Sequence, residues 1–130
     1  MSDRYREGMR IRREVLGDAH VDAAEARKSN FDEAFQQLIT EAAWGNVWAR
    51  DGLPRRERSM LTIALLAAGG NFDEIPMHIR ATANTGASPD DVMEALLHVA
   101  IYAGVPKANR AIAIARLACL LYTSPSPRDS

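Results

Sequence analysis

Two histidines in the sequence each follow a glutamate by four residues. Glu74 precedes His78, and Glu94 precedes His98; residues at this spacing lie on one face of a helix. A carboxylate one turn from an imidazole orients the ring and stabilises its protonated form. Glu74 and His78 are therefore a candidate general acid or base near neutral pH. The alternative is a surface ion pair, which contributes about 0.5 kcal/mol or less.

The second of these pairs continues one helical turn further, to Tyr102. His98 and Tyr102 flank the apolar face of the same predicted helix, which places them at the rim of a pocket in one interpretation. In the other, they are amphipathic side chains that form hydrogen bonds at a helix interface. The apolar face comprises Val92, Met93, Leu96, Leu97 and Ala100.

An arginine and two tryptophans are candidates for ligand contact. Arg58 and Ser59 stand at the polar start of an apolar helix, where a guanidinium can bind a carboxylate through two hydrogen bonds. The alternative is an ordinary exposed arginine within a run of four charged residues. Trp44 and Trp48 lie one helical turn apart, a spacing typical of core packing, with a ligand wall as the alternative.

Metal and thiol chemistry have no motif in this sequence. The histidines at positions 20, 78 and 98 lack the paired spacing of a zinc site. Cys119 is the only cysteine, so neither a disulfide framework nor a CxxC redox motif exists. No Ser-His-Asp elbow, phosphate loop or dinucleotide fingerprint is present. We therefore expect a site made of side-chain acids and bases, without a metal and without a cofactor.

The composition is that of a globular protein. The chain has 130 residues, 47% hydrophobic and 25% charged, with a net charge of −1, which fits one domain. This balance provides no basic face for nucleic acid or for an anionic membrane surface. The charged N-terminus lacks the apolar core of a signal peptide, and the longest apolar run, 60–68, is about half of what spans a bilayer. The sequence therefore predicts a cytoplasmic protein.

Glycine and proline divide the first half of the chain into helical segments. Ser2 caps a first helix that ends at Gly17, and the polar residues 17–28 predict a loop. A second helix begins at Ser29 or Asn30 and ends before the glycine and proline near residue 53. Its apolar residues fall on one face with a 3.6-residue period, and they are Phe31, Phe35, Leu38, Ile39 and Ala42.

The second half predicts four further helices. The helix at 55–68 is apolar all round after its first turn, which predicts the buried centre of a bundle. Asp73 caps a helix at 73–85 and so keeps Pro76 within the first turn, where a missing N–H is tolerated. Residues 88–103 form a helix capped by a serine, and an alanine-rich last helix follows the proline at 106.

These segments predict an all-α fold, a compact bundle of five or six helices in one domain over residues 1–119. No alternation of polar and apolar residues predicts a strand. Residues 120–130 cannot bury a helical face, and we interpret them as a non-native or disordered tail.

Five stretches in the same order resemble the carboxymuconolactone decarboxylase family. They are residues 12–22, 43–53, 58–64, 77–81 and 100–109, and the resemblance covers about residues 4–117. It implies an alkylhydroperoxidase-D-like fold, assembled as a homohexamer. It also implies cofactor-free loss of carbon dioxide from a dicarboxylate lactone, 4-carboxymuconolactone. The product is 3-oxoadipate enol-lactone, in the protocatechuate branch of the beta-ketoadipate pathway of aromatic catabolism.

The resemblance gives expected roles to the candidate residues. His78 is expected to donate a proton, with Glu74 orienting its ring, and Arg58 is expected to bind a substrate carboxylate. Tyr102 is expected to donate a hydrogen bond toward the lactone oxygen. The remaining expected substrate-binding residues are Ser59, His98, Asn109, Trp44 and Trp48.

Three departures and two alternatives belong with this resemblance. Peroxidase members of the wider family carry CxxC followed by histidine, whereas Glu74 and His78 stand here where the second cysteine and the histidine would be. This departure argues against a thiol peroxidase. Pro76 is unusual in a helix and tilts Glu74, and His98 stands where an amide is expected in close relatives. A non-catalytic oligomeric binding protein and a thiol peroxidase are the two alternative functions.

Overall fold

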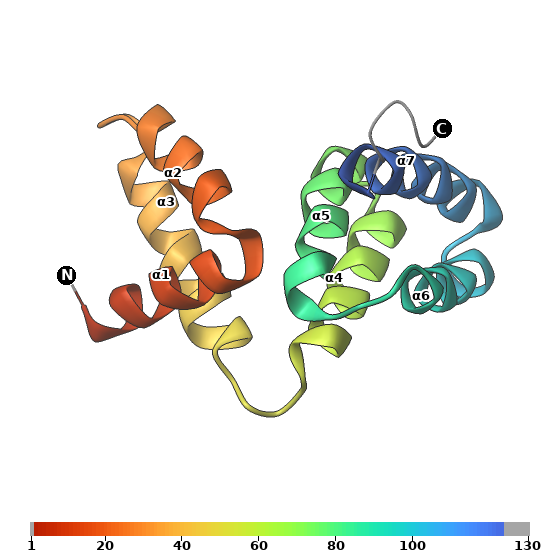
Figure 1. The fold of residues 1–130 in the computed structure, drawn as a ribbon, viewed down its shortest axis with the longest axis horizontal. Helices are drawn as coiled ribbons and strands as arrows, with labels where there is room; N and C mark the ends of the chain where they lie inside the picture. The colour runs from red at the N-terminus through yellow and green to blue at the C-terminus, as the bar shows by residue number, and fades with distance from the viewer. Residues whose placement is uncertain (1, 124–130) are drawn as a thin grey trace. The chain divides into compact units, whose positions relative to one another are not determined.

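The computed structural model describes residues 2–123, with side chains described up to residue 119. Every regular element in the described chain is a helix (Figure 1), which confirms the all-α prediction. The chain divides into two compact units, Met1–Arg58 and Ser59–Ser130. The expectation of a single domain over residues 1–119 stays a prediction. None of the described helices is long and apolar enough to cross a membrane.

The first unit contains four helical segments before the start of α4. They are α1 (Asp3–Leu16), α2 (Asp18–Arg27), α3 (Glu33–Ile39) and the π-helix η1 (Thr40–Trp48). Helix α1 begins where the sequence predicts, because the Ser2 side chain accepts a hydrogen bond from the backbone N–H of Tyr5. It ends at Gly17, which has a φ of 91°. The Ser2 cap and the Gly17 end of this helix are confirmed.

Helix α1 packs against η1 through two glycines. A Cβ atom on Gly8 would overlap the backbone carbonyl oxygen of Thr40, and one on Gly45 would lie 2.7 Å from the carbonyl oxygen of Arg4. Any larger residue at either position would force the two backbones apart. The close approach buries Tyr5 and Val15 on α1 and both tryptophans on η1.

The prediction of a loop at residues 17–28 is wrong, because Asp18–Arg27 forms α2. This helix buries only Val21, so it carries no apolar stripe for periodicity to detect. Arg13 instead holds its first turns through ion pairs with Asp18, at 3.1 Å, and Asp22, at 2.9 Å. Asp18 also lies at the positive end of the helix dipole.

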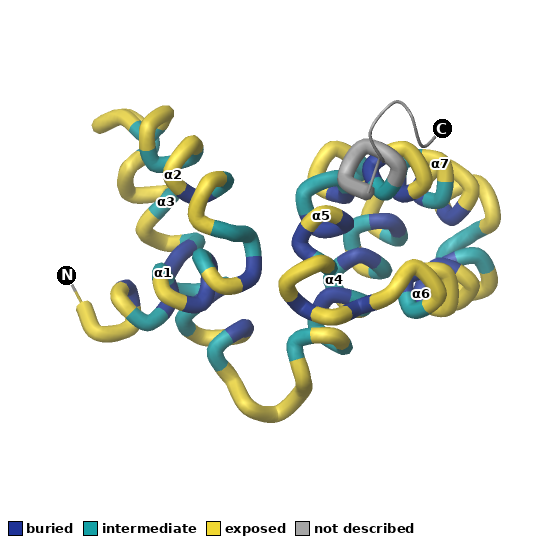
Figure 2. The backbone as a smooth tube through the Cα atoms, in the orientation of Figure 1, coloured by how far each residue is buried: buried dark blue, intermediate teal, exposed yellow. Residues whose placement is uncertain are grey.

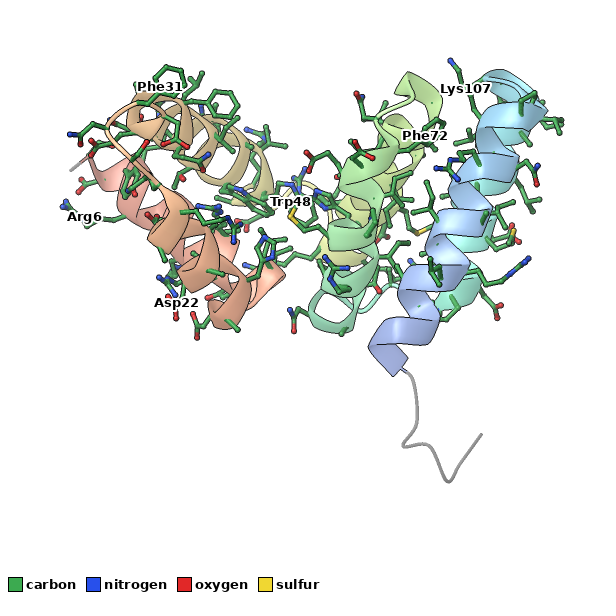
Figure 3. All side chains as sticks on the ribbon, turned by 90° about the horizontal axis from the view of Figure 1, so that it is seen from above. Arg6, Asp22, Phe31, Trp48, Phe72 and Lys107 are labelled. Atoms are coloured by element: carbon green, nitrogen blue, oxygen red, sulfur yellow. The ribbon has the colours of Figure 1, made fainter. Side chains whose placement is uncertain are left out.

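Helix α3 begins at Glu33, later than predicted, with Asp32 in the capping position. None of its residues is buried (Figure 2). Of the apolar residues expected on one face, only Phe35, Leu38 and Ile39 lie in α3. The Phe31 side chain just before it is 98% exposed and projects outward in Figure 3. Phe35 and Leu38 are also exposed. The apolar period therefore identifies a helix here whose apolar face the single chain leaves open.

The second unit is built from the rest of α4 (Arg55–Gly69), the 3-10 helix η2 (Phe72–Glu74) and three further helices. These are α5 (Ile75–Thr85), α6 (Pro89–Tyr102) and α7 (Val105–Thr123). The Ser88 cap of α6 is confirmed: Ser88 and Asp91 exchange side-chain to backbone hydrogen bonds in a capping box. Lys107 Nζ on α7 donates a 2.9 Å hydrogen bond to the carbonyl of Ala68 at the end of α4.

One hydrophobic core runs through the second unit. Its fully buried members from α4, α5 and α6 include Ile63, Ile75 and Leu96. Alanines supply the contribution of α7, and their small side chains let that helix approach the others closely. They are Ala108, Ala111, Ala115 and Ala118.

Two further details of the second half differ from the predictions. Helix α4 is not the buried centre of a bundle: Leu65 is 70% exposed, because the chain covers only the face that carries Ser59, Ile63 and Ala67. Helix α5 begins at Ile75 with Glu74 as its cap, not Asp73, because residues 72–74 form a 3-10 turn. Pro76 still falls in the first turn, as predicted.

The described chain has seven α-helices where five or six were predicted. The extra α-helix is α2, and the second predicted helix corresponds to α3 followed by the π-helix η1. Helix α7 continues to Thr123, past residue 120, where the predicted tail begins. The rest of that tail, 124–130, lies outside the described residues.

Candidate active site

Helix α5 carries His78 one turn from its N-terminus. The His78 side chain is buried, at 9% exposure, while Glu74, the cap of the helix, is exposed. The two residues therefore differ in their contact with solvent although they are four residues apart. Burial keeps bulk water away from the His78 ring, and its role as a proton donor stays a prediction. The orienting role of Glu74 stays a prediction.

Helix α6 presents His98 and Tyr102 on one exposed face. Their rings are stacked, with centroids 6.2 Å apart and an interplanar angle of 12°. Tyr102 is 84% exposed, and Glu94 lies one turn before His98 on the same helix, also exposed. The structure therefore brings these two predicted residues together. In the single chain they lie in solvent, beside the exposed apolar side chain of Leu97.

Ser59 and Asn109 occupy contrasting positions in the second unit. The Ser59 side chain is 1% exposed, and its Oγ donates a hydrogen bond of 2.7 Å to Thr85 Oγ1. This contact joins α4 to the end of α5, the helix that carries His78. Asn109 lies on α7 and is exposed.

Trp44 and Trp48 lie together on η1. Their ring centroids are 5.2 Å apart with the planes tilted by 35°, and both side chains are buried, at 4% and 7% exposure. The core-packing interpretation is therefore confirmed for both. Trp48 also lines a cavity in the loop that follows η1.

This cavity has a volume of about 320 Å³ and lies within the first unit. We call it the loop cavity. Its walls are Trp48, Ala49, Arg50, Asp51, Leu53, Pro54 and Arg55.

Arg58 stabilises the loop that forms this cavity. Its Nη2 donates a hydrogen bond of 3.2 Å to the backbone carbonyl of Arg50. A Cβ atom on Gly52 would lie 3.9 Å from the same nitrogen, so the guanidinium also contacts the middle of the loop. The Arg58 Nε is buried and has no acceptor among the described residues. Arg58 is therefore a loop-bound cation and not an ordinary exposed arginine.

Sequence reasoning missed the two arginines in the cavity wall. Arg55 forms an ion pair of 2.7 Å with Glu14 of α1, and this hydrogen bond lowers the pKa of Glu14. Arg50 is exposed, and among the described residues its side chain forms no ion pair. The available signal was the matching stretch 43–53, which contains Arg50 between a tryptophan and a glycine.

A buried arginine on α1 was also missed. Arg12 is only 7% exposed, and burial lowers its pKa while the charge of Glu25 opposes that change. It lies in the matching stretch 12–22, but an arginine in a charged N-terminal helix reads from sequence as a solvated residue.

A second cavity lies within the second unit, between α5, α6 and α7, with a volume of about 300 Å³. Its walls are mainly apolar, and none of the predicted site residues lines it. Among the described residues, no group of three or more potential metal ligands comes together.

Comparisons with known proteins identify the family. The family model described as "Carboxymuconolactone decarboxylase family" matches residues 33–117. A protein of Acinetobacter baylyi named 4-carboxymuconolactone decarboxylase is 46% identical over 112 residues, which cover 86% of this chain and 84% of the relative. A protein of Metarhizium robertsii named nitrosuccinic acid decarboxylase npaB is 38% identical over 110 residues, covering 85% of this chain and 77% of the relative.

A shorter protein of Pseudomonas putida, also named 4-carboxymuconolactone decarboxylase, is 49% identical over 43 residues. These residues cover 33% of this chain and 90% of that relative. The family model spans helices α3 to α7 and therefore includes both the loop cavity and His78. Because the family model and the Acinetobacter relative each match most of its length, the chain belongs to the carboxymuconolactone decarboxylase family.

Proposed function

We propose that this protein decarboxylates 4-carboxymuconolactone to 3-oxoadipate enol-lactone, without a cofactor, in the protocatechuate branch of the beta-ketoadipate pathway. The observation that carries the proposal is the 46% identity over 112 residues to a relative of that name. The second relative, with 38% identity, is also named a decarboxylase. Loss of a carboxylate is thus common to the activities that these two names state.

The chemistry needs only side-chain groups. In the substrate, the departing carboxylate is attached to the ring carbon next to the lactone oxygen, and a double bond conjugates this carbon with the lactone carbonyl. When the bond to the carboxylate breaks, carbon dioxide leaves and the electron pair forms a dienolate. A proton must then reach the carbon alpha to the carbonyl, and hydrogen-bond donors must stabilise the oxyanion.

His78 is the proposed proton donor. Its burial on α5 supports this role, because a proton held away from bulk water is delivered to the dienolate and not exchanged. Glu74 is proposed to orient the ring from the helix cap. Tyr102, His98 and Asn109 are proposed donors toward the lactone oxygen, and all three side chains are exposed in the single chain.

Arg58 is the proposed partner of a substrate carboxylate. A dianion does not enter a site of low polarity unless cations meet it, and Arg58 is fixed at the loop cavity by its bond to Arg50. Trp48 is proposed to contact the substrate where it lines that cavity, with Trp44 supporting it from behind. Ser59 is also a proposed substrate contact, although its hydroxyl is bonded to Thr85.

We further propose that the protein is cytoplasmic and assembles as a homohexamer. Support for assembly comes from large apolar side chains that the single chain leaves in solvent on several helices. Exposed apolar surface of this extent is typical of an interface. The most exposed are Phe31, Phe35 and Leu38 in the first unit and Leu65, Ile101 and Leu117 in the second.

The proposal is tested by supplying two acids to the purified protein in separate reactions. One is enzymatically generated 4-carboxymuconolactone and the other is nitrosuccinate, the acid in the name of the Metarhizium relative. Release of carbon dioxide from the lactone alone supports the proposed substrate. Release from nitrosuccinate alone replaces that substrate within the same reaction class. Binding of either acid without release supports the alternative of a binding protein.

A further inference from the structure

Four charged or aromatic side chains meet at the loop cavity, and only some of them are already engaged. Arg55 is bound to Glu14 across 2.7 Å, and Arg58 donates to the Arg50 carbonyl across 3.2 Å. The Arg50 guanidinium lines the cavity and, within the described part of the chain, forms no ion pair. It is thus the cation at this cavity whose donors are open to a ligand.

The size and the lining of the cavity suit a small carboxylic acid. Its volume of about 320 Å³ falls at the lower end of the range for small-molecule sites, roughly 300–1,000 Å³. Trp48, Leu53 and Pro54 provide apolar walls, while Arg50 and Arg55 outnumber the single carboxylate of Asp51. A ligand with an apolar centre and a carboxylate at its end would meet both an apolar wall and a cation.

The loop itself is held in place for such a contact. Arg58 binds the backbone carbonyl of Arg50 from one side. The backbone N–H of Arg50 donates a 3.1 Å hydrogen bond to the carbonyl of Val47 at the end of η1. The backbone N–H and the carbonyl of Arg50 are therefore both hydrogen-bonded, so the position of its Cα atom is fixed before a ligand binds.

We propose that the loop cavity is a carboxylate subsite in which Arg50 binds one carboxylate of a small dicarboxylate through a bidentate, charge-assisted contact. Trp48 packs against the apolar part of the same ligand. The inference rests on the proposed decarboxylase function for the identity of the natural ligand, and it adds Arg50 as a second cation beside Arg58. Two cations match the two charges of the substrate.

A binding titration tests the subsite without requiring turnover. Adipate is added to the full chain and tryptophan fluorescence is recorded, because both tryptophans of the sequence lie in the first unit, within 5.2 Å of each other. Adipamide, which has the same length and no charge, is the matched ligand. The wild-type protein is expected to bind adipate more tightly than adipamide.

Arg50→Gln is expected to weaken adipate binding about tenfold or more, the usual effect of losing a charge-assisted contact, while adipamide binding stays unchanged. Arg50→Lys should restore part of the loss. Arg56→Gln is the matched control, because Arg56 is an exposed arginine in the first turn of α4 that does not line the cavity. It should bind adipate as the wild type does.

Three results would overturn the subsite: no binding of adipate by the wild type, equal adipate affinity in Arg50→Gln and wild type, or equal losses of adipate affinity in Arg50→Gln and Arg56→Gln.

Turnover of 4-carboxymuconolactone is measured separately, and Arg50→Gln should raise KM with little change in kcat. If Arg50→Gln turns over the lactone normally and binds adipate as the wild type does, the subsite is wrong and the proposed decarboxylase function stands. If Arg50→Gln no longer binds adipate but the wild type does not turn over the lactone, the subsite stands and the proposed function is wrong.

Discussion

The Oγ of Ser59 lies 2.7 Å from Thr85 Oγ1 and donates a hydrogen bond to it, with both side chains buried. The two hydroxyls join α4 to the last residue of α5. Helix α5 has three turns and carries His78. A residue whose type and position suggested contact with substrate thus forms part of the interior of the second unit.

Ser59→Ala should lower the free energy of unfolding by about 1–3 kcal/mol, because the Thr85 hydroxyl loses its buried partner. The double variant Ser59→Ala/Thr85→Val should lose less than Ser59→Ala alone, since neither polar group is then left unsatisfied. Urea unfolding of the three proteins measures both effects. A raised KM with unchanged stability in Ser59→Ala would instead favour the substrate contact.

His78→Ala should lower kcat for 4-carboxymuconolactone by about 10²–10⁴-fold, the usual range for a lost general acid. His20→Ala is the matched control, since it removes an imidazole from α2 that has no proposed role in the site, and its kcat should stay close to that of the wild type. Glu74→Gln should also cost less than His78→Ala. Near-normal turnover in a folded, assembled His78→Ala protein would transfer the proton-donor role to His98 or Tyr102.

The sequence predicted the elements whose ends have strong local signals. Ser2, Gly17 and Ser88 mark helix ends that the structure reproduces, because a cap or a positive φ depends only on neighbouring residues. Helix α2 escaped detection since a helix held by ion pairs to Arg13 carries no apolar period. A helix without an apolar period gives sequence analysis no pattern to detect.

The candidate site shows the same division. The spacing of His98 and Tyr102 predicted their shared face, and that of Trp44 and Trp48 predicted their packing. The engagement of Ser59 by Thr85, 26 residues away, depends on how α4 and α5 pack. The loop cavity around Arg50 likewise depends on the turn between η1 and α4, whose geometry no periodic pattern encodes.

The Glu14 and Arg55 ion pair gives a defined dependence of stability on pH. Its hydrogen bond lowers the pKa of Glu14 from the ordinary value of 4.5, so the folded protein favours the ionised carboxylate. The stabilisation is fully present above pH 4.5 and is lost as the pH falls through the lower, folded-state pKa. Because the pair is partly exposed, we expect it to contribute about 0.5 kcal/mol to the free energy of unfolding.

Urea unfolding of wild type and Arg55→Gln between pH 7 and pH 3 checks this dependence. The wild type should be the more stable protein at pH 7, and the difference between the two should shrink below pH 4.5. Glu14→Gln should lose at least as much stability at pH 7 as Arg55→Gln, because Glu14 also forms an ion pair of 2.7 Å with Arg10. A difference that stays constant down to pH 3 would mean that the pair does not contribute through the Glu14 charge.

Leu65→Glu should shift the protein from a hexamer toward smaller species, because Leu65 is 70% exposed in the single chain and a charge would be costly in an apolar interface. Ala83→Glu adds the same charge at an exposed position of α5 and should leave the assembly unchanged. Light scattering coupled to size-exclusion chromatography measures both. A monomeric wild type, or equal dissociation in the two variants, would contradict the proposed interface.

The central claim is that this chain catalyses loss of carbon dioxide from 4-carboxymuconolactone. The most direct measurement follows the ultraviolet absorbance of the enzymatically generated lactone after the purified protein is added, with carbon dioxide quantified in the same sample. We expect the absorbance to fall with one carbon dioxide released per lactone, at a rate proportional to protein concentration and with no added cofactor. If the absorbance falls no faster with folded, assembled protein than it does without protein, the account is contradicted.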